Sequence, residues 1–297
     1  MTKAAERRLL PPTIESSRER ERLRTVVFPE HGDLAVAIAD RIVEIIQRET
    51  RAKGRAVLGL ATGSTPLGVY EELIRRHQAG DVDFSHVITF NLDEYYPMAP
   101  DSSHSYRRYM WENFFALINI AKENVHIPDG TTPRERVADA CASYEAAIRA
   151  AGGIDFQLLG IGKTGHIGFN EPGSDAASRT RIVTLDTLTR KDAAADFFGV
   201  ENVPREAITM GVATILDAKE VALMATGEHK AGIVARAVEG DISPDVAATF
   251  LQRHPSVSVY LDLAAAADLT RIKTPWVLEG GGVEWTPALV ERSVVWL

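Results

Sequence analysis

The chain has 297 residues, of which 45% are hydrophobic and 25% charged, a mixture typical of globular proteins and unlike that of disordered ones. Its formal net charge of −8 at pH 7 argues against a general surface for nucleic acid or anionic membranes, so local groups must hold any anionic ligand. The length allows two domains of about 150 residues, but we favour one α/β domain of about 200–250 residues with extensions.

Cysteine usage and the N-terminus indicate the compartment. The single cysteine, Cys141, excludes an intrachain disulfide and an all-cysteine metal site, and we expect it to be a packing residue. The charged N-terminus lacks the apolar core of a signal peptide, and no run approaches the roughly 18 apolar residues of a membrane span. We therefore expect a cytoplasmic protein with no membrane partner.

In chain order, the charged residues 1–27 predict an N-terminal extension. Apolar residues at helical spacing in 34–49 predict an amphipathic helix. Short runs rich in Val, Ile and Leu then predict strands buried on both faces, at 55–62, 86–92, 156–162, 221–226 and 257–263. Helical patterns lie between several of them, at 66–80, 134–153 and 229–240. This alternation predicts a mostly parallel sheet with helices on both faces.

Four expected turns carry unusual residues at the carboxyl ends of these strands, where open parallel sheets bind ligands. The first is ATGSTPLG, residues 61–68, which places three hydroxyls before a proline. We expect Thr65 to cap a helix that starts at Pro66, leaving free amides and hydroxyls to hold a phosphate. An ordinary, well-capped turn is the alternative.

The second turn, FNLDEYYP (residues 90–97), contains the adjacent carboxylates Asp93 and Glu94. A carboxylate at the mouth of a dry crevice would have a raised pKa and could serve as a general base. Two acids in a solvated loop are the alternative.

The third turn, LGIGKTGHIGFNEPGS (residues 159–174), places His166 five positions before Glu171. The imidazole can exchange a proton near neutral pH, and the carboxylate could orient or ionise it. One histidine and one acid are too few for a zinc site, so we expect no metal. A glycine-rich turn with a hydrogen-bonded histidine is the alternative.

The fourth turn, ATGEHKAG (residues 225–232), places Lys230 in the first turn of an expected helix. The helix dipole disfavours a cation there unless an anion binds beside it, which makes Lys230 a candidate phosphate ligand. A lysine that simply reaches into water is the alternative. Together the four turns suggest proton transfer next to a carbonyl or imine on a small phosphorylated substrate. Neither a metal nor a nucleotide cofactor is expected, since the chain has no GxGxxG or Walker loop.

The motifs LGLATGSTPLGVYEEL, VITFNLDEYYP, GIGKTGHIGFNEPGS, ASRTRIVTL and TGEHKA occur in the order found in glucosamine-6-phosphate deaminases (isomerases), and the chain resembles that family over about residues 30–265. The resemblance implies a Rossmann-like α/β three-layer sandwich at 28–270 and conversion of glucosamine 6-phosphate and water to fructose 6-phosphate and ammonia. It leaves residues 271–297 as a C-terminal extension. It implies a catalytic base at Asp93, a ring-opening residue at His166 and a carboxylate partner for it at Glu171. The implied phosphate-binding residues are Thr62, Gly63, Ser64, Thr65 and Lys230.

Two positions depart from the family pattern. Thr164 stands where the family has the aspartate of Asp-Gly-His, which removes one carboxylate near His166. Asp196 precedes Phe197-Phe198 where the family has a phosphate-contacting arginine, and Lys163 or Arg179 could supply that charge instead.

Three functions remain open from the sequence. The first is an active aldose–ketose isomerising deaminase acting on an amino-sugar phosphate. The second is a non-catalytic sugar-phosphate-binding or sensing module. The third is a phosphogluconolactonase, against which the segment IGFNEP (residues 167–172) speaks. The expected partner is a small sugar phosphate rather than nucleic acid or membrane, and the oligomeric state, including a homo-oligomer, stays open.

Overall fold

The structure, a computed structural model, describes residues 14–15, 20–278, 287 and 290. Within these residues the main sheet has the strand order β1-β2-β11-β10-β7-β3-β4-β6, and every neighbouring pair is parallel except β1 with β2. Its strands are β1 (Ile14–Glu15), β2 (Arg24–Phe28), β3 (Ala56–Leu60), β4 (Val87–Asn91), β6 (Val125–His126), β7 (Phe156–Gly160), β10 (Val221–Ala225) and β11 (Val257–Asp262). The predicted mostly parallel sheet is confirmed, and the five predicted strands are present with slightly shorter bounds.

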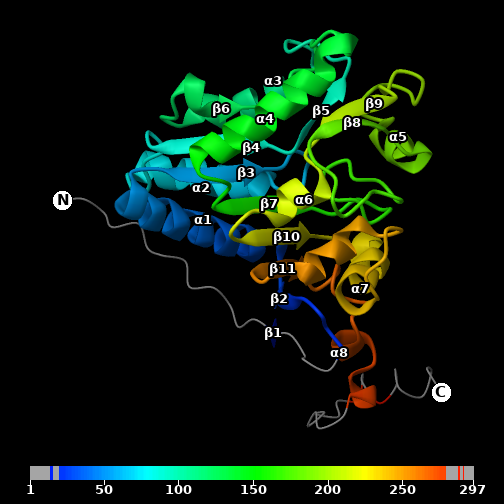
Figure 1. Ribbon diagram of the computed structural model, residues 1–297. Coiled ribbons are helices and arrows are strands. Elements are labelled where there is room, and N and C mark those ends of the chain that lie inside the picture. The colour runs from blue at the N-terminus through cyan, green and yellow to red at the C-terminus, as the bar shows by residue number, and fades with distance from the viewer. Residues whose placement is uncertain (1–13, 16–19, 279–286, 288–289, 291–297) are drawn as a thin grey trace.

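Helices cover both faces of this sheet, so the predicted three-layer α/β sandwich is confirmed (Figure 1). Successive strand residues point to opposite faces. Leu58 packs in a core with helices α1–α3, whereas its neighbour Val57 packs in a core with α4, α6 and α7. The helices are α1 (His31–Lys53), α2 (Leu67–Ala79), α3 (Tyr106–Asn113), α4 (Val137–Ala151), α5 (Thr187–Ala193), α6 (Val212–Leu216), α7 (Ala231–Glu239) and α8 (Thr270–Lys273).

A second, antiparallel sheet lies beyond the main one, with the order β5-β9-β8, and α5 lies beside it (Figure 1). Its strands are β5 (Asp93–Tyr96), β8 (Arg181–Thr184) and β9 (Glu206–Thr209). The sequence pattern did not predict this sheet and indicated a turn for Asp93 and Glu94. Each strand has only four residues, and β5 pairs with β9, at least 110 positions away, so no local pattern indicates β5.

Both predicted domain boundaries fall inside structural elements. The boundary between residues 27 and 28 divides β2, which pairs with β11 over Arg24–Phe28. The boundary between 270 and 271 divides α8, where Arg271 donates a hydrogen bond to Thr25 on β2 (2.8 Å). The chain on either side of the predicted domain is therefore part of the sheet or attached to it. Much of the predicted extensions, including Pro11-Pro12, lies outside the described residues.

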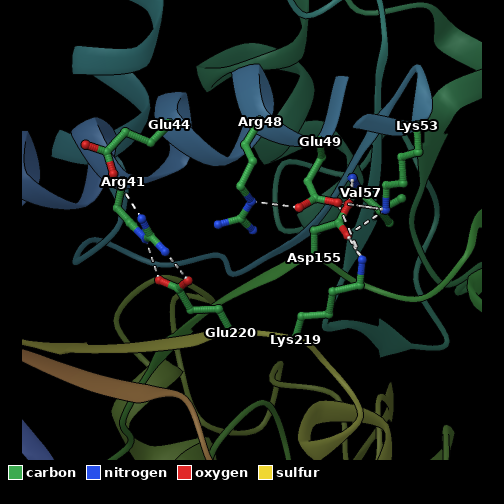
Figure 2. A network of polar contacts seen from close by, with 9 residues as sticks. All are labelled: Arg41, Glu44, Arg48, Glu49, Lys53, Val57, Asp155, Lys219 and Glu220. Carbon is green, nitrogen blue, oxygen red and sulfur yellow. Dashed lines mark hydrogen bonds and ion pairs between the residues drawn. The ribbon is translucent and has the colours of Figure 1, made fainter. Parts of the chain in front are cut away.

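The amino ends of the strands carry a network of paired charges between α1 and the sheet (Figure 2). Asp155 precedes β7 and is fully buried, and its carboxylate accepts hydrogen bonds from Lys53 (2.6 and 2.8 Å), Lys219 (2.7 Å) and the backbone amide of Val57 (2.8 Å). Beside it, Arg41 on α1 forms a two-pronged pair with Glu220 (2.6 and 2.7 Å). Every oxygen of the buried carboxylate therefore has a partner, which offsets its desolvation.

Candidate active site

The loop after β3 presents unpaired backbone amides at the carboxyl edge of the sheet. The N–H groups of Gly63, Ser64 and Thr65 donate no hydrogen bond to any described residue. Gly63 has φ of 111°, a conformation that glycine adopts without strain. Such successive free amides form a concave site suited to an anion.

The predicted helix cap at Thr65 is wrong. The N-cap of α2 is Pro66, whose carbonyl accepts hydrogen bonds from Val69 (3.0 Å) and Tyr70 (3.1 Å), and no side chain caps the helix. The helix therefore begins one residue later, at Leu67. This leaves Thr65 in the loop with its amide uncommitted, as it would also be at an N-cap, so the predicted phosphate loop keeps this donor.

Asp93 and Glu94 open β5 and lie in opposite environments, because adjacent strand residues point to opposite sides. Glu94 accepts hydrogen bonds from the hydroxyl of Ser105 (2.7 Å) and from the amides of Tyr95 (2.9 Å), Tyr106 (3.0 Å) and Arg107 (3.0 Å). It thereby satisfies the first amides of α3, which identifies it as a structural residue. Asp93 is 6% exposed, and its carboxylate accepts no hydrogen bond from any described residue.

This environment raises the pKa of Asp93 to about 8, through burial first and the neighbouring charge of Glu94 second. The alternative of two acids in a solvated loop is therefore wrong. A buried carboxyl group without a donor to stabilise its charge readily holds and releases a proton near neutral pH. That is the property which the sequence analysis required of a general base.

The second sheet brings the histidine loop against Asp93. Thr209 on β9 lies opposite Asp93 in the β5–β9 register, and its hydroxyl accepts a hydrogen bond from the amide of Phe169 (3.0 Å). A Cβ atom added to Gly168 would lie 3.3 Å from Oδ2 of Asp93 and 2.9 Å from Oγ1 of Thr209. Glycine at 168 therefore allows the loop backbone to pass beside the carboxylate. Asn170, which is fully buried, fastens the loop by donating to the carbonyls of Ile167 and Met210 (both 2.8 Å).

His166 and Glu171 form the pair that the sequence predicted. Nδ1 of His166 lies 3.1 Å from Oε2 of Glu171 and 2.9 Å from Oγ1 of Thr164. Burial opposes the charge of Glu171, but its hydrogen bond and ion pair with His166 outweigh it and hold the pKa of Glu171 below its ordinary value. The other carboxylate oxygen accepts a hydrogen bond from the amide of Asp186 at the start of α5 (3.2 Å). The Glu171 carboxylate thus orients the imidazole through Nδ1.

The opposite ring nitrogen of His166 is open. Nε2 forms no hydrogen bond with any described residue. The imidazole lies against the backbone of Gly162, where an added Cβ would come within 2.1 Å of Cε1 and Nε2. The ring occupies this position only because residue 162 has no side chain, and its free nitrogen can exchange a proton with a bound substrate.

Lys230 lies where the loops after β7 and β10 meet. It occupies the N-cap position of α7 rather than the predicted first turn, at the end of a single turn of 3₁₀ helix, Glu228–Lys230. Its Nζ donates to the carbonyl of Ile161 (2.9 Å), and burial lowers its pKa. Within the described part of the chain no carboxylate forms an ion pair with it. The helix dipole and partial burial therefore leave this cation available for an anionic ligand.

Of the two cations considered as replacements for the family arginine, Arg179 is engaged elsewhere. Its guanidinium forms ion pairs with Asp217 and, at 3.8 Å, with Glu145. Lys163 instead pairs with Asp192 on α5 (2.6 Å).

Three described residues complete the arrangement and were missed from the sequence. Thr209 and Asn170 hold the histidine loop, and Tyr106 lies between Asp93 and the phosphate loop. Burial first, and then the charges of Tyr95 and Asp93, raise the pKa of Tyr106, whereas Thr62 lowers it. Asn170 was visible in the quoted motif, but nothing local distinguishes the other two from packing residues.

Neither a metal nor a membrane site is evident in the described ranges. They hold no group of three or more His, Cys, Asp or Glu side chains placed to share a metal ion. Nor does any helix formed by these residues combine the length and apolarity needed to cross a membrane.

Comparison with known proteins places this arrangement in a family. A glucosamine-6-phosphate deaminase of Bacillus subtilis is 50% identical over 76% of this chain and 90% of its own length. A glucosamine-6-phosphate deaminase-like protein of Bacteroides thetaiotaomicron is 41% identical over 93% of this chain, which spans 42% of that longer protein. A solved monomeric glucosamine-6-phosphate deaminase is 40% identical, covers 82% of this chain with 99% of its own, and superimposes with a TM-score of 0.78. Residues 29–259 match the family of glucosamine-6-phosphate isomerases and 6-phosphogluconolactonases, and the chain belongs to that family.

Proposed function

We propose that this protein is a glucosamine-6-phosphate deaminase, which converts the amino-sugar phosphate and water to fructose 6-phosphate and ammonia. The observation that carries the proposal is the buried, unpartnered carboxylate of Asp93 beside the loop that bears His166. Relatives of up to 50% identity with the deaminase name support it. A protein that only bound sugar phosphates would need the phosphate loop but not a desolvated base.

The phosphate group would bind to the free amides of Gly63, Ser64 and Thr65 and to the ammonium group of Lys230, with the Thr62 hydroxyl beside them. Charge-assisted hydrogen bonds of this kind are strong and fix the sugar relative to the reacting groups. The phosphate loop follows β3 and Asp93 follows the adjacent strand β4, so a sugar held by its phosphate would extend toward the base.

His166 would open the pyranose ring. Its Nε2 takes the proton of the C1 hydroxyl and delivers it to the ring oxygen as the bond between C1 and that oxygen breaks, which leaves an aldehyde at C1 and an amine at C2. Glu171 holds the imidazole through Nδ1 and stabilises its charged form. Thr164 adds a hydroxyl rather than a second carboxylate to this group, so the charged imidazole has one acidic partner here.

Asp93 would then isomerise the open-chain sugar. Its carboxylate removes the proton from C2 to give an enolamine and returns a proton to C1, which forms an imine at C2 and a hydroxymethyl group at C1. Water adds to the imine carbon, and ammonia leaves to give the ketose. The positive charge of the substrate amine would favour the ionised carboxylate while substrate is bound.

An ammonia-release assay tests the proposal. The native chain should release ammonia from glucosamine 6-phosphate and little from unphosphorylated glucosamine, and Asp93→Asn should abolish release while still binding the substrate in calorimetry. Tight binding of the sugar phosphate without turnover by the native chain would support the binding module. Acid release from 6-phosphogluconolactone without ammonia release would support the lactonase.

The proposed reaction places the protein in amino-sugar metabolism. We further infer a role in N-acetylglucosamine catabolism and a cytoplasmic location, because phosphorylated sugars do not cross membranes freely and the chain carries one cysteine. A homo-oligomer remains a prediction, which light scattering would test.

A further inference from the structure

Two lysines and one aspartate lie at the edge of the proposed site. Nζ of Lys163 lies 2.6 Å from Oδ1 of Asp192, and these side chains are 52% and 38% exposed. Lys230 lies close to them, because its ammonium group is bonded to the carbonyl of Ile161, two positions before Lys163. Among the described residues only Lys163 forms an ion pair with Asp192, but the charges of both residues act on Lys230.

The charges of this cluster act on one another. The pKa of Lys230 is lowered first by burial and further by the charge of Lys163, and the charge of Asp192 opposes this effect. The cluster therefore carries one excess positive charge that no described carboxylate compensates. A phosphate dianion would compensate it, and binding between two ammonium groups is the arrangement that favours such an anion.

The position of the cluster also matches the phosphate loop. Lys163 follows β7, which lies between β3 and β10 and is hydrogen-bonded to both. The loop after β3 carries the free amides, and the loop after β10 carries Lys230. Lys163 therefore lies between the two elements that we propose to bind phosphate, whereas the position before Phe197-Phe198 holds the carboxylate of Asp196.

We propose that Lys163 is a second phosphate-binding cation, and that Asp192 is an internal counterion which holds its ammonium group until the substrate phosphate replaces it. The proposal rests on the proposed function for the location of the phosphate. The ion pair is partly exposed and adds little to stability, so exchange of one anion for another is easy. Because Asp192 competes with the substrate, the two partners of this one ion pair have opposite effects on binding.

The opposite effects expected of the two substitutions, at Lys163 and at Asp192, define the experiment. Lys163→Gln should raise both the KM for glucosamine 6-phosphate and the Kd for inorganic phosphate by about 10-fold, with a smaller effect on kcat. Asp192→Asn should lower both constants about 2–5-fold. The matched control is Arg134→Gln, which breaks an ion pair with Glu206 of similar length (2.9 Å) and exposure (57% and 32%) at the other end of β9 from Thr209, and it should change neither constant.

A shift of both variants in the same direction would overturn the proposal, since it would identify the pair as a structural one. An unchanged phosphate Kd in Lys163→Gln would overturn it equally. Calorimetry with inorganic phosphate requires no turnover, so it tests the lysine even in a protein that fails to release ammonia. Failure of the proposed function and failure of this inference are therefore distinguishable.

Discussion

Buried acidic side chains have opposite environments at the two ends of the parallel strands. At the amino ends, Asp155 is fully buried and accepts hydrogen bonds from two lysines and a backbone amide (Figure 2). At the carboxyl ends, Asp93 is almost as deeply buried and accepts none from any described residue. The same type of side chain is stabilised as a charge before β7 at one end of the parallel strands, and destabilised as a charge after β4 at the other end. The first arrangement contributes to stability, and the second leaves a proton free to move.

Removing the unpaired acid should have the largest effect on activity. We expect Asp93→Asn to lower kcat at least about 10³-fold, because the amide cannot accept the C2 proton. The measurement is steady-state ammonia release at saturating glucosamine 6-phosphate. Glu94→Gln is the matched comparison, and there the principal loss should be in Tm, because Glu94 holds the first amides of α3. Equal losses of kcat in the two variants would contradict the division of roles.

The same substitution should stabilise the fold at alkaline pH. Between the ordinary carboxyl pKa of 3.8 and about 8, the folded protein keeps a proton on Asp93 that the unfolded chain releases, so stability from this group falls as pH rises through that window. Asp93→Asn removes the cost, and we expect it to gain about 1–3 kcal/mol at pH 9 and nothing at pH 3.5. Urea unfolding at both pH values measures this change in the free energy of unfolding. A loss of stability at pH 9 would contradict the environment described for Asp93.

Removing Asp155, the acid with hydrogen-bond partners, should lower the free energy of unfolding and leave kcat nearly unchanged. We expect Asp155→Ala to cost about 2–4 kcal/mol of unfolding free energy, because the amide of Val57 and two lysines lose their partner. The kcat of the folded fraction should stay within about 2-fold, because Asp155 lies at the opposite end of the sheet. Lys219→Gln, at a side chain 51% exposed, should cost under about 1 kcal/mol. Urea unfolding measures the loss of stability in each variant, and the rate of ammonia release per folded active site measures kcat.

Crowding the imidazole should have an intermediate effect. Gly162→Ala would place a methyl group within 2.1 Å of the His166 ring, so the ring must turn away from its position. We expect a loss of about 10²-fold in kcat. Gly160→Ala is a close control, since an added Cβ there meets nothing within 4 Å, and it should be nearly neutral. A fully active Gly162→Ala would show that the ring position is not needed.

The smallest expected effect is at the residue that departs from the family pattern. Thr164→Val removes the hydroxyl that lies 2.9 Å from Nδ1 of His166 and keeps the shape of the side chain. We expect kcat to fall about 3–10-fold, since Glu171 still orients the ring. Thermal unfolding should change little. A loss as large as that of Asp93→Asn would mean that the hydroxyl, rather than Glu171, orients the imidazole.

The sequence was sufficient for five strands of the main sheet because they are nearly continuous apolar runs such as 221–225, which a doubly covered sheet buries. It did not predict β1, β2 and β6. It also placed the candidate residues at the correct edge, because the carboxyl ends of parallel strands lie together. The partner of His166 could be predicted for a local reason, since Glu171 lies in the same loop.

The environment of Asp93 could not be predicted, because it depends on contacts between distant segments. Thr209 lies opposite Asp93 only after two four-residue strands have paired across more than 110 positions. Which of two adjacent acids is satisfied depends on where α3 begins, and the hydroxyl and amides that satisfy Glu94 follow it by 11–13 positions. Sequence spacing alone therefore leaves the roles of Asp93 and Glu94 interchangeable.

Direct titration of Asp93 tests the central claim. The carboxyl carbon can be followed by NMR in protein labelled with carbon-13 at aspartate, with its signal assigned by its loss in Asp93→Asn. The free protein should show a midpoint near pH 8, because the group is buried without a donor. A midpoint near the ordinary value of 3.8 would show that the carboxylate is stabilised as a charge, and the contrast between the two ends of the sheet would not exist.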